Sequence, residues 1–452
     1  MFEFFRLFFY MLFYSDLPFW DIYRVLNILA FCLLYRNSEE NRILLSKKLS
    51  DLGIVVIKLS QWLAYFIDIR YEDYEYLQLF IKTLPLLQSS CKKEKNVNLT
   101  KLLEPYQHIV KELDSDILAA ASIGQIYKGK SYDGKDIVVK IKHANIDSDI
   151  LKWEKFLKKT FLTLNIKIDL DSFFIALKNQ LDFSNEAKNM KTFYKKYKKN
   201  DLVIIPEFID GDKNVIIMEY VPSMNFRDFR KNCSEQELTY YLMLSRILYQ
   251  DTIFIQDIIH LDLHNANYGI QVEKRAIVLY DFGWVLEDQF DFKKFFILCH
   301  INCKRPLEFF LQKYNLDYNT RLSDYIKELI EKREIDILEG LKVIIKLFPN
   351  NIVLDDFMFC VLSVCIFVAS LMDKLQTDLD SHLLEEIKFI DKYKEQNAFP
   401  SLGAILKYSV ENSENGFLSK WYSIGSRPLL FLIFQSAPFF SKAIAFSGEC
   451  CT

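Results

Sequence analysis

The feature that most constrains this chain is a pair of polar motifs that lie close together in its second half. Residues 260–267 read His-Leu-Asp-Leu-His-Asn-Ala-Asn, an H-x-D-x-x-x-x-N pattern, and residues 281–283 read Asp-Phe-Gly. Apolar residues 277–279 precede the second motif, as they would in a buried strand. This order and spacing predict a loop followed by a β-hairpin that brings acidic and amide side chains to one place.

Phosphoryl transfer requires groups of these kinds in this order. One Asp orients or deprotonates the attacking hydroxyl, while an Asn and a second Asp hold magnesium ions on the nucleotide phosphates. We therefore expect Asp262 to be catalytic, and Asn267 and Asp281 to be metal ligands. The predicted cofactors are ATP and Mg²⁺, because Mg²⁺ accepts a few protein oxygens together with phosphates and water.

Lys140 and Glu186 are the other candidate catalytic residues. Lys140 follows the apolar run 137–139, a pattern that predicts a lysine at the end of a buried strand. Such a lysine can reach the α- and β-phosphates if a glutamate holds it, and Glu186 in the predicted helix 181–193 is the candidate partner. Burying either charge alone would be costly, so we predict that the two side chains pair.

The chain has no G-x-G-x-x-G loop to cover a nucleotide. The corresponding position is alanine-rich, which predicts a stiffer loop than a glycine-rich one, and a short helical or turn segment is the alternative. This predicted nucleotide-binding loop consists of Ala119, Ala120, Ala121, Ser122, Ile123, Gly124 and Gln125. A hinge that binds adenine through backbone groups is predicted at Met218, Glu219, Tyr220 and Val221.

The segment after Gly283 differs from that of an ordinary protein kinase. Residues 284–296 are predicted to be helical, and no A-P-E motif follows them. An ordinary protein kinase uses that activation segment as the platform for its peptide substrate. The sequence therefore argues against ordinary phosphorylation of proteins.

The order of predicted elements indicates the fold class. Strands are expected at residues 122–129, 136–142, 202–205 and 215–218, and helices predominate after Ser234. Strands first and helices afterwards is typical of a two-lobed α+β fold with a small β-containing N-lobe and a helical C-lobe. Apolar residues make up 51% of the chain, so it is globular, and its net charge of −3 argues against a nucleic-acid partner.

A long helix is predicted before the first strand, starting from a capping box formed by Asn37 and Glu40. Its buried stripe is expected to contain Leu45, Leu49, Leu52, Val56, Leu59 and Leu63. Lys58 and Gln61 lie three apart on another face of this helix.

Three apolar segments bear on membrane contact. Residues 1–35 are interrupted by charges, so they either pack against the body of the protein or lie in a membrane interface. Residues 357–372 suit a buried helix better than a span, and residues 428–440 are shorter still. We predict an intracellular protein without a signal peptide or a certain transmembrane helix, and peripheral membrane association as an option.

Five sequence blocks, in order, resemble the UbiB or AarF-domain atypical kinases. Residues 52–61 resemble the family's K-x-G-Q helix, residues 119–125 its alanine-rich loop, and residues 180–189 its E-x-D and E-A-x-N helix. The other two blocks are residues 260–267 and 281–283. The resemblance extends from about Leu45 to about Leu375.

The resemblance implies an ATPase-like member of the kinase superfamily that is linked to isoprenoid quinone or lipid metabolism. It also implies a helical extension that covers the cleft, with Lys58, Gln61, Gln180 and Asp182 in regulatory positions. Two residues depart from the family pattern, because Ser60 replaces a glycine and Gln180 replaces a glutamate. Both departures affect the regulatory positions rather than the phosphate chemistry.

The domain boundaries that we predict combine these observations. They are an apolar helical segment at 1–36, the K-x-G-Q-type extension at 37–90, the N-lobe at 91–220, the C-lobe at 221–380 and a helical tail at 381–452. An isoprenoid or another lipid is the small-molecule partner that the resemblance implies.

Two other functions remain open at this stage. A small-molecule kinase of the aminoglycoside or choline type also carries H-x-D-x-x-x-x-N and a later Asp, but it lacks the Lys58 helix and the alanine-rich loop. A nucleotide-gated lipid-binding scaffold would need the ATP site but not Asp262.

Overall fold

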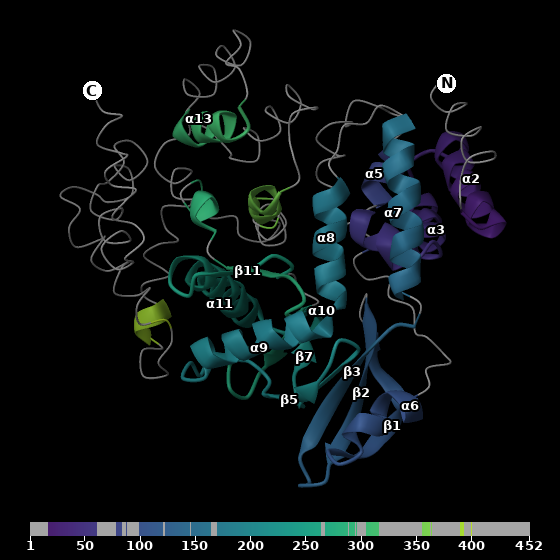
Figure 1. Cartoon of the computed structure of the whole chain (residues 1–452). Helices are drawn as coiled ribbons and strands as arrows, with labels where there is room; N and C mark the ends of the chain where they lie inside the picture. Colours follow the sequence, from purple (N-terminus) through teal and green to yellow (C-terminus); the bar gives the residue numbers. More distant parts are fainter. Residues whose placement is uncertain are drawn as a thin grey trace.

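The computed structural model describes residues 17–60, 78–83, 87, 99–120, 123–144, 146–163, 170–263, 267–287, 289–293, 295, 304–315, 355–361, 363, 389–392 and 399. These residues form a twisted sheet at one end of the molecule, a mainly helical region beside it, and a group of helices from the N-terminal part of the chain (Figure 1). This arrangement confirms the predicted α+β fold.

The N-lobe is built on a five-stranded antiparallel sheet with the strand order β1-β2-β3-β6-β5. The strands are β1 Val110–Ala120, β2 Gly124–Ser131, β3 Asp136–Lys142, β5 Phe208–Gly211 and β6 Val215–Glu219. β1 and β2 are consecutive antiparallel strands, and Ala120 at the end of β1 pairs with Gln125 in β2.

The two faces of β3 have different roles. Ile137, Val139 and Ile141 are buried in a small apolar core with Tyr106, which belongs to the 3-10 helix η3 Glu104–Tyr106 beside α6 Leu99–Leu103. Because successive side chains of a strand point to opposite faces, Val138 and Lys140 lie on the other face. Val138 joins the large core of the molecule, so Lys140 also points toward the helices.

Three helices separate the first strands of the N-lobe from its last two. They are α7 Ile146–Thr163, α8 Leu170–Leu181 and α9 Phe183–Tyr197. Asp182 forms the boundary between α8 and α9, since its side chain accepts a hydrogen bond from Ser184 N and caps α9. In α9, Glu186 and the apolar side chains are buried, while the lysines are exposed.

The C-lobe combines helices with two small sheets. Its helices include α10 Phe226–Asn232, α13 Lys304–Lys313 and α11 Glu235–Phe254, which begins with a capping box between Ser234 and Glu237. One sheet has the order β4-β10-β9-β7, and β8 pairs with β11 in the other. Their strands are β4 Val203–Ile204, β7 Met224–Asn225, β8 Ile258–His260, β9 Tyr268–Gln271, β10 Ala276–Leu279 and β11 Val285–Glu287.

The N-terminal helices pack beside α7 and α8 (Figure 1). They are α2 Phe19–Leu34, α3 Glu39–Ser50, the helical residues 54–60 and α5 Gln78–Thr83. Asp21 in α2 forms an ion pair with Lys152 in α7, with 2.9 Å between Oδ2 and Nζ. This contact attaches the N-terminal helices to the segment that leads into α9.

The prediction of one long helix after residue 37 is wrong. Gly53 has a φ of +102°, which an L side chain rarely adopts, and the helix is broken there into α3 and residues 54–60. The N-cap is Ser38 rather than Asn37, and Val56 is only partly buried. Leu63 lies outside the described residues.

Two other local predictions are wrong. Ala119 and Ala120 belong to β1, a strand that the sequence analysis did not predict, and not to a loop or a short helical segment. Residues 285–287 form β11 instead of a helix, because they pair with β8 next to the first polar motif. Helical residues follow only from residue 290.

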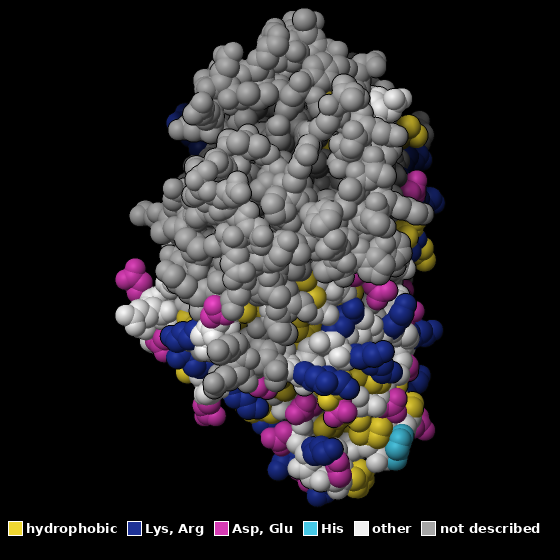
Figure 2. Space-filling view, turned by 90° about the vertical axis from the view of Figure 1, so that its left-hand side faces the viewer, with side chains coloured by type: hydrophobic (Ala, Val, Ile, Leu, Met, Phe, Trp, Pro, Cys, Tyr) yellow, Lys and Arg dark blue, Asp and Glu magenta, His cyan; other side chains and the backbone are white. Residues whose placement is uncertain are grey.

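The surface of the described part of the chain mixes charges of both signs. On the face drawn in Figure 2, basic and acidic side chains alternate over the described residues. None of the described helices has the length and apolar character needed to cross a bilayer. Residues 1–16, 428–440 and most of 357–372 lie outside the described residues.

Asp251 gives the helical core a pH-dependent stability. This buried residue of α11 accepts hydrogen bonds from Tyr197 Oη at 2.8 Å and Gln256 Nε2 at 3.1 Å, and burial raises its pKa to about 6. A raised pKa means that the folded state binds this proton more tightly than the unfolded state. The stabilisation that Asp251 contributes when it is protonated is therefore complete below its pKa in the unfolded state. It is lost as the pH rises through its folded-state pKa of about 6.

We predict that Asp251→Asn removes this pH dependence. Between pH 5 and pH 7, the wild-type protein should lose about 1 kcal/mol of unfolding free energy relative to Asp251→Asn. Urea denaturation at both pH values measures the difference. If the difference in unfolding free energy between the two proteins is the same at both pH values, the raised pKa of Asp251 is contradicted.

Candidate functional site

Lys140 and Glu186 form a buried ion pair at the centre of the site. The distance from Lys140 Nζ to Glu186 Oε1 is 2.6 Å, and each side chain is only 2% exposed. Asp281 Oδ2 lies 3.5 Å from the same ammonium group, and the Asp281 side chain is 25% exposed. The predicted pairing of Lys140 with Glu186 is therefore confirmed, and Asp281 joins it from the second polar motif.

The charges of this cluster shift the pKa values of its members. Burial would lower the pKa of Lys140, but Asp281 and Glu186 outweigh it and raise that pKa. Burial raises the pKa of Glu186 to about 7 against the opposing effect of Lys140, and Asp281 raises it further. The pKa of Asp281 is lowered, because Lys140, Lys58 and the Gly283 N–H outweigh the effect of burial. Asp281 is thus the carboxylate that stays ionised.

His260 connects the two polar motifs. Its Nδ1 accepts a hydrogen bond from Asp262 N at 3.3 Å, so its Nε2 carries the proton and donates to Asp281 O at 2.6 Å. The ring is completely buried and lies edge-on to Phe193 and tilted against Phe282. A neutral imidazole therefore fixes the backbone on both sides of the site.

Asn267 lies between the two aspartates. Tyr280 N donates to Asn267 O at 3.1 Å, next to the β9–β10 pairing, so the hairpin places Asn267 beside the residue that precedes Asp281. The Asn267 side chain donates through Nδ2 to Asp262 O at 2.8 Å. The structure thus brings Asp262, Asn267 and Asp281 to one end of the hairpin, as the sequence motifs predicted. Residues 264–266 lie outside the described residues.

Lys58 reaches this site from the N-terminal helices. Its Nζ lies 3.1 Å from Asp262 Oδ2, and its side chain is 7% exposed. Two cations therefore face the aspartates, Lys140 from the sheet and Lys58 from the extension. The adjacent Ser60 is also buried, whereas Gln61 lies outside the described residues.

The inner face of α9 holds the site together through three residues in register. Glu186 binds Lys140, Asn189 Nδ2 donates to Phe282 O at 2.9 Å, and Phe193 packs on the Phe282 ring with centroids 5.1 Å apart. Spacings of three and four residues place all of them on one side of a helix. The sequence analysis did not assign roles to Asn189 and Phe193, although their spacing from Glu186 was a usable signal.

The residues of the predicted nucleotide-binding loop differ in burial and in the contacts that they make. Ile123 is buried, and Gln125 is fully buried with its Nε2 bonded to Tyr127 Oη at 3.0 Å, so both side chains support the hairpin. Gly124 is needed for packing, because a Cβ there would lie 2.5 Å from Ile141 O. Ala121 and Ser122 lie outside the described residues, and the role of the loop stays a prediction.

The predicted hinge follows β6. Met218 is buried in the strand, Glu219 N donates to Glu207 O at 2.9 Å, and Tyr220 N donates to Asp136 O at 3.1 Å. These two N–H groups are therefore already used within the sheet. Adenine would have to contact the carbonyl groups or the backbone of Val221.

The two predicted regulatory residues next to α9 differ in their contacts. Asp182 caps α9, which is a structural role. Gln180 is 3% exposed, and its Nε2 has no hydrogen-bond partner among the described residues. The Gln180 carbonyl lies near Gly283, where an added Cβ would be 4.0 Å from it. Gln180 is thus buried against the second polar motif.

The donor set fits magnesium. Asp281 offers a carboxylate and Asn267 an amide oxygen, and Mg²⁺ takes hard oxygen ligands with water and phosphate oxygens filling the other positions. The part of the chain that the structure describes contains no cluster of three or more His, Cys, Asp or Glu residues that could enclose a metal by themselves. A metal here would therefore depend on nucleotide phosphates for further ligands.

Sequence comparison identifies the domain that contains this geometry. Residues 86–305 match the family model of the ABC1 atypical kinase-like domain. This region of the chain is therefore similar to the ABC1 atypical kinase-like family. The match includes Lys140, Glu186, Asp262, Asn267 and Asp281, and it confirms the predicted resemblance and fold class.

Several proteins of known sequence are similar to the chain. A protein of Paramecium bursaria Chlorella virus 1 designated A445L is 27% identical over 56% of this chain and 52% of its own length. The Arabidopsis thaliana protein ACTIVITY OF BC1 COMPLEX KINASE 1, chloroplastic, is 28% identical over 40% of this chain and 28% of its own length. Mouse AarF domain-containing protein kinase 1 is 26% identical over 48% and 46%. The matched part thus spans about half the length of these relatives or less.

Among solved structures, the complex of Rv3197 with erythromycin from Mycobacterium tuberculosis is similar to this chain. Its sequence is 17% identical, the TM-score is 0.44, and the match covers 60% of this chain and 78% of that one.

The central ion pair should behave as a coupled unit. We predict that Lys140→Met alone lowers the unfolding free energy by about 3 kcal/mol, because it leaves buried carboxylates without their cation. In the double variant Lys140→Met/Glu186→Leu, the loss should be smaller than the sum of the two single losses by at least about 1 kcal/mol. Urea denaturation of the four proteins measures this coupling.

Lys142→Met is the matched control, since Lys142 lies on the same strand but pairs with Asp147, which is 71% exposed. This control should change the unfolding free energy by at most about 1 kcal/mol. Additive losses at Lys140 and Glu186 would contradict the coupling.

Proposed function

We propose that this protein is an atypical kinase-like ATPase of the UbiB type that binds Mg-ATP beside the Lys140–Glu186 pair and the β9–β10 hairpin. The observation that carries the proposal is the Lys140–Glu186 pair, at 2.6 Å, with Asp281 beside it and Asp262 and Asn267 at the end of the adjacent hairpin. Similarity to the ABC1 family supports a phosphotransferase kind of activity.

Each residue would contribute a separate part of the chemistry. Lys140, held by Glu186, would neutralise the α- and β-phosphates, and Asp281 with Asn267 would hold Mg²⁺, which supplies charge neutralisation on the phosphate oxygens. Asp262 would orient the attacking water or hydroxyl. His260 keeps the Asp262 and Asp281 backbones at a fixed separation, so that the metal-binding and nucleophile-positioning groups stay aligned.

Lys58 would restrain this activity. Its ammonium group lies 3.1 Å from Asp262 Oδ2, so it would compete with a nucleophile for this carboxylate, and its charge also acts on Asp281, the proposed metal ligand. This position agrees with the covering role that the resemblance implies for the extension. Release of Lys58 would then be a step that precedes turnover.

The lipid link is part of the same proposal. The exposed aromatic residues of α2, Phe19, Trp20 and Tyr23, are between 55% and 72% exposed, which favours a peripheral contact with a membrane interface. We therefore include isoprenoid or other lipids as the small-molecule partners. Addition of lipid vesicles to the ADP-release assay described below tests this link, and an unchanged rate would count against it.

A small-molecule kinase is the second enzymatic candidate, and ADP release that depends stoichiometrically on a defined alcohol would favour it. The non-enzymatic scaffold is less well supported, because the contact between Asn267 and Asp262 retains an arrangement that a scaffold does not need.

The first functional prediction concerns Mg-ATP. At about 100 times its dissociation constant, Mg-ATP should stabilise the protein by about 2.7 kcal/mol, measured as a thermal shift. Asp281→Asn should lose this shift, since it removes the carboxylate that holds the metal. Asp262→Asn should keep the shift but release no ADP. If both variants bind and turn over Mg-ATP like the wild type, the proposed site is wrong.

The second functional prediction concerns Lys58. Lys58→Ala should lower the Mg²⁺ concentration needed for half-maximal ADP release, because it removes a competing cation from Asp262 and Asp281. Lys58→Arg should stay close to the wild type. Lys48→Ala, whose side chain bonds to Asn27 within the extension, is the control for damage to these helices. An identical Mg²⁺ dependence in Lys58→Ala and the wild type would rule out the restraint.

A further inference from the structure

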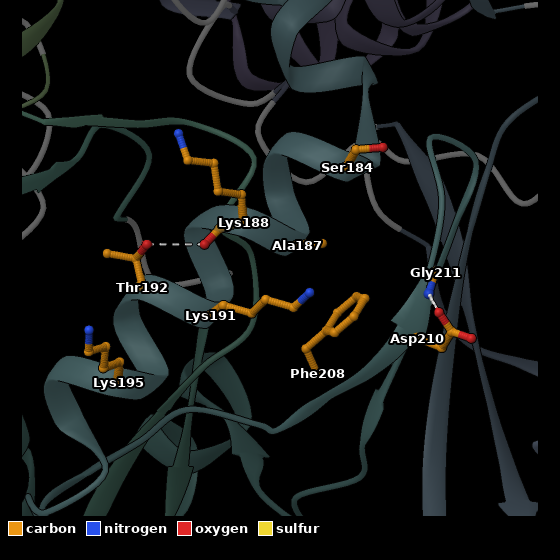
Figure 3. A pocket seen from close by; sticks show the side chains of 9 residues that line it. All are labelled: Ser184, Ala187, Lys188, Lys191, Thr192, Lys195, Phe208, Asp210 and Gly211. Carbon is orange, nitrogen blue, oxygen red and sulfur yellow. Dashed lines mark hydrogen bonds between the residues drawn. The ribbon is translucent and has the colours of Figure 1, made fainter.

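A cavity lies on the outer face of α9, whereas the ion pair with Lys140 lies on its inner face. Its volume is about 500 Å³, and α9 and β5 form its walls. The lining residues that carry the argument are Ala187, Lys188, Lys191, Lys195 and Phe208. Figure 3 shows Lys191 extending from α9 toward the Phe208 ring on the neighbouring strand.

The cavity is rich in positive charge. Lys188, Lys191 and Lys195 recur at spacings of three and four residues, so they share one face of α9. Within the described residues, no carboxylate forms an ion pair with any of these three lysines. The lining carboxylate, Asp210, accepts a hydrogen bond from Gly211 N on its own strand. The lining thus carries three cations and one acidic side chain.

The cavity floor is apolar between these charges. Lys191 Nζ lies 4.1 Å from the centre of the Phe208 ring, and Ala187 beside it is small and buried. An aromatic ring under an ammonium group favours the cation electrostatically, and the same ring offers a surface to an apolar side chain. The site therefore suits a ligand that carries both carboxylates and an apolar group.

The length of the charged row favours a peptide over a compact anion. Lys188 and Lys195 are seven residues apart, which corresponds to about 10 Å along a helix. In an extended peptide, acidic residues four positions apart are separated by about 13 Å and point to the same side as the residue midway between them. Flexible lysine side chains can bridge the difference, whereas a single phosphate could contact only one end of the row.

We propose that this cavity docks an extended acidic segment of a partner protein, with two carboxylates flanking an apolar side chain. The peptide would lie along α9, its carboxylates near Lys188 and Lys195 and its apolar side chain against Phe208. Charge complementarity to three lysines that form no ion pair with any described carboxylate is the observation that identifies this occupant.

The position of the cavity links docking to the nucleotide site. The same helix holds Lys140 through Glu186 and the Phe282 carbonyl through Asn189. A ligand that fixes the position of α9 would therefore favour one arrangement of Lys140, Glu186 and the Phe282 backbone. This linkage rests on the proposed Mg-ATP function, but the docking itself does not.

The test uses a fluorescein-labelled peptide, Gly-Glu-Ser-Phe-Ser-Glu-Gly, with fluorescence anisotropy measured on the full chain without nucleotide. Lys191→Gln/Lys195→Gln should weaken binding about tenfold, which corresponds to about 1.4 kcal/mol. The matched control, Lys198→Gln/Lys199→Gln, removes the same charge from exposed positions just beyond α9 and should weaken it less than about twofold. Peptides with Lys in place of Glu, or Ser in place of Phe, should bind more weakly than the parent.

Several outcomes would overturn the proposal. Equal losses in both double variants would indicate general attraction by basic surface. Competition by inorganic phosphate at the same concentration as the peptide would assign the cavity to a compact anion. Binding of anionic vesicles alone, lost in Lys191→Gln/Lys195→Gln, would assign it to a membrane surface.

The linkage has its own measurement. Saturating Mg-ATP should change the dissociation constant of the peptide, and the peptide should change that of Mg-ATP by the same factor. If Mg-ATP does not bind at all, the proposed function fails while docking stands. If both bind without affecting each other, the linkage through α9 is wrong.

Discussion

The pairing of Lys140 with Glu186 is the interaction on which the arrangement of the cleft depends. Both groups are 2% exposed, so each requires the other to compensate for the loss of hydration. The pair fixes α9 against β3, and α9 in turn fixes the Phe282 backbone through Asn189. The position of Asp281 follows, since it precedes Phe282 and its carbonyl is held by His260.

The two lobes of the site are therefore joined by polar contacts of α9 rather than by the sheet. The sheet supplies Lys140, the C-lobe supplies the aspartates, and α9 contacts both. The extension adds Lys58 from a third direction. Such a site can respond to a movement of α9 or of the extension, because both contact the polar motifs from distant parts of the sequence.

The sequence predicted the chemically constrained parts of this structure well. Motifs whose spacing leaves few arrangements placed Lys140, Asp262, Asn267 and Asp281. The strand that contains Lys140 has a continuous apolar run at residues 137–139, as expected for a strand buried on both faces. It did not predict β1, because irregularities in the pairing of β1 with β2 disturb its alternation. Residues 285–287 were assigned to a helix because a short apolar run has no clear period, and pairing with β8 decided their structure.

The break at Gly53 and the contact of Lys58 with Asp262 depend on the tertiary structure. The periodic apolar pattern of residues 45–59 is compatible with one continuous helix, and only the positive φ of Gly53 reveals the change of direction. Lys58 reaches a residue 204 positions away, which local sequence patterns cannot specify. The roles of the alanine-rich segment and the hinge remain predictions, since the contacts of their described residues are within the sheet and Ala121 and Ser122 lie outside the described residues.

The charges gathered around His260 also bear on the order in which Mg²⁺ and a nucleotide would bind. Glu186, Asp262 and Asp281 carry three acidic groups, and Lys58 and Lys140 carry two ammonium groups, so the described cluster has an excess of acid when all are ionised. A nucleotide that entered this site without a cation would be repelled by the carboxylate that no ammonium group balances. Under the proposed function, Mg²⁺ would bind together with the nucleotide phosphates when all three carboxylates are ionised, and loss of Mg²⁺ would weaken the binding of the product that remains.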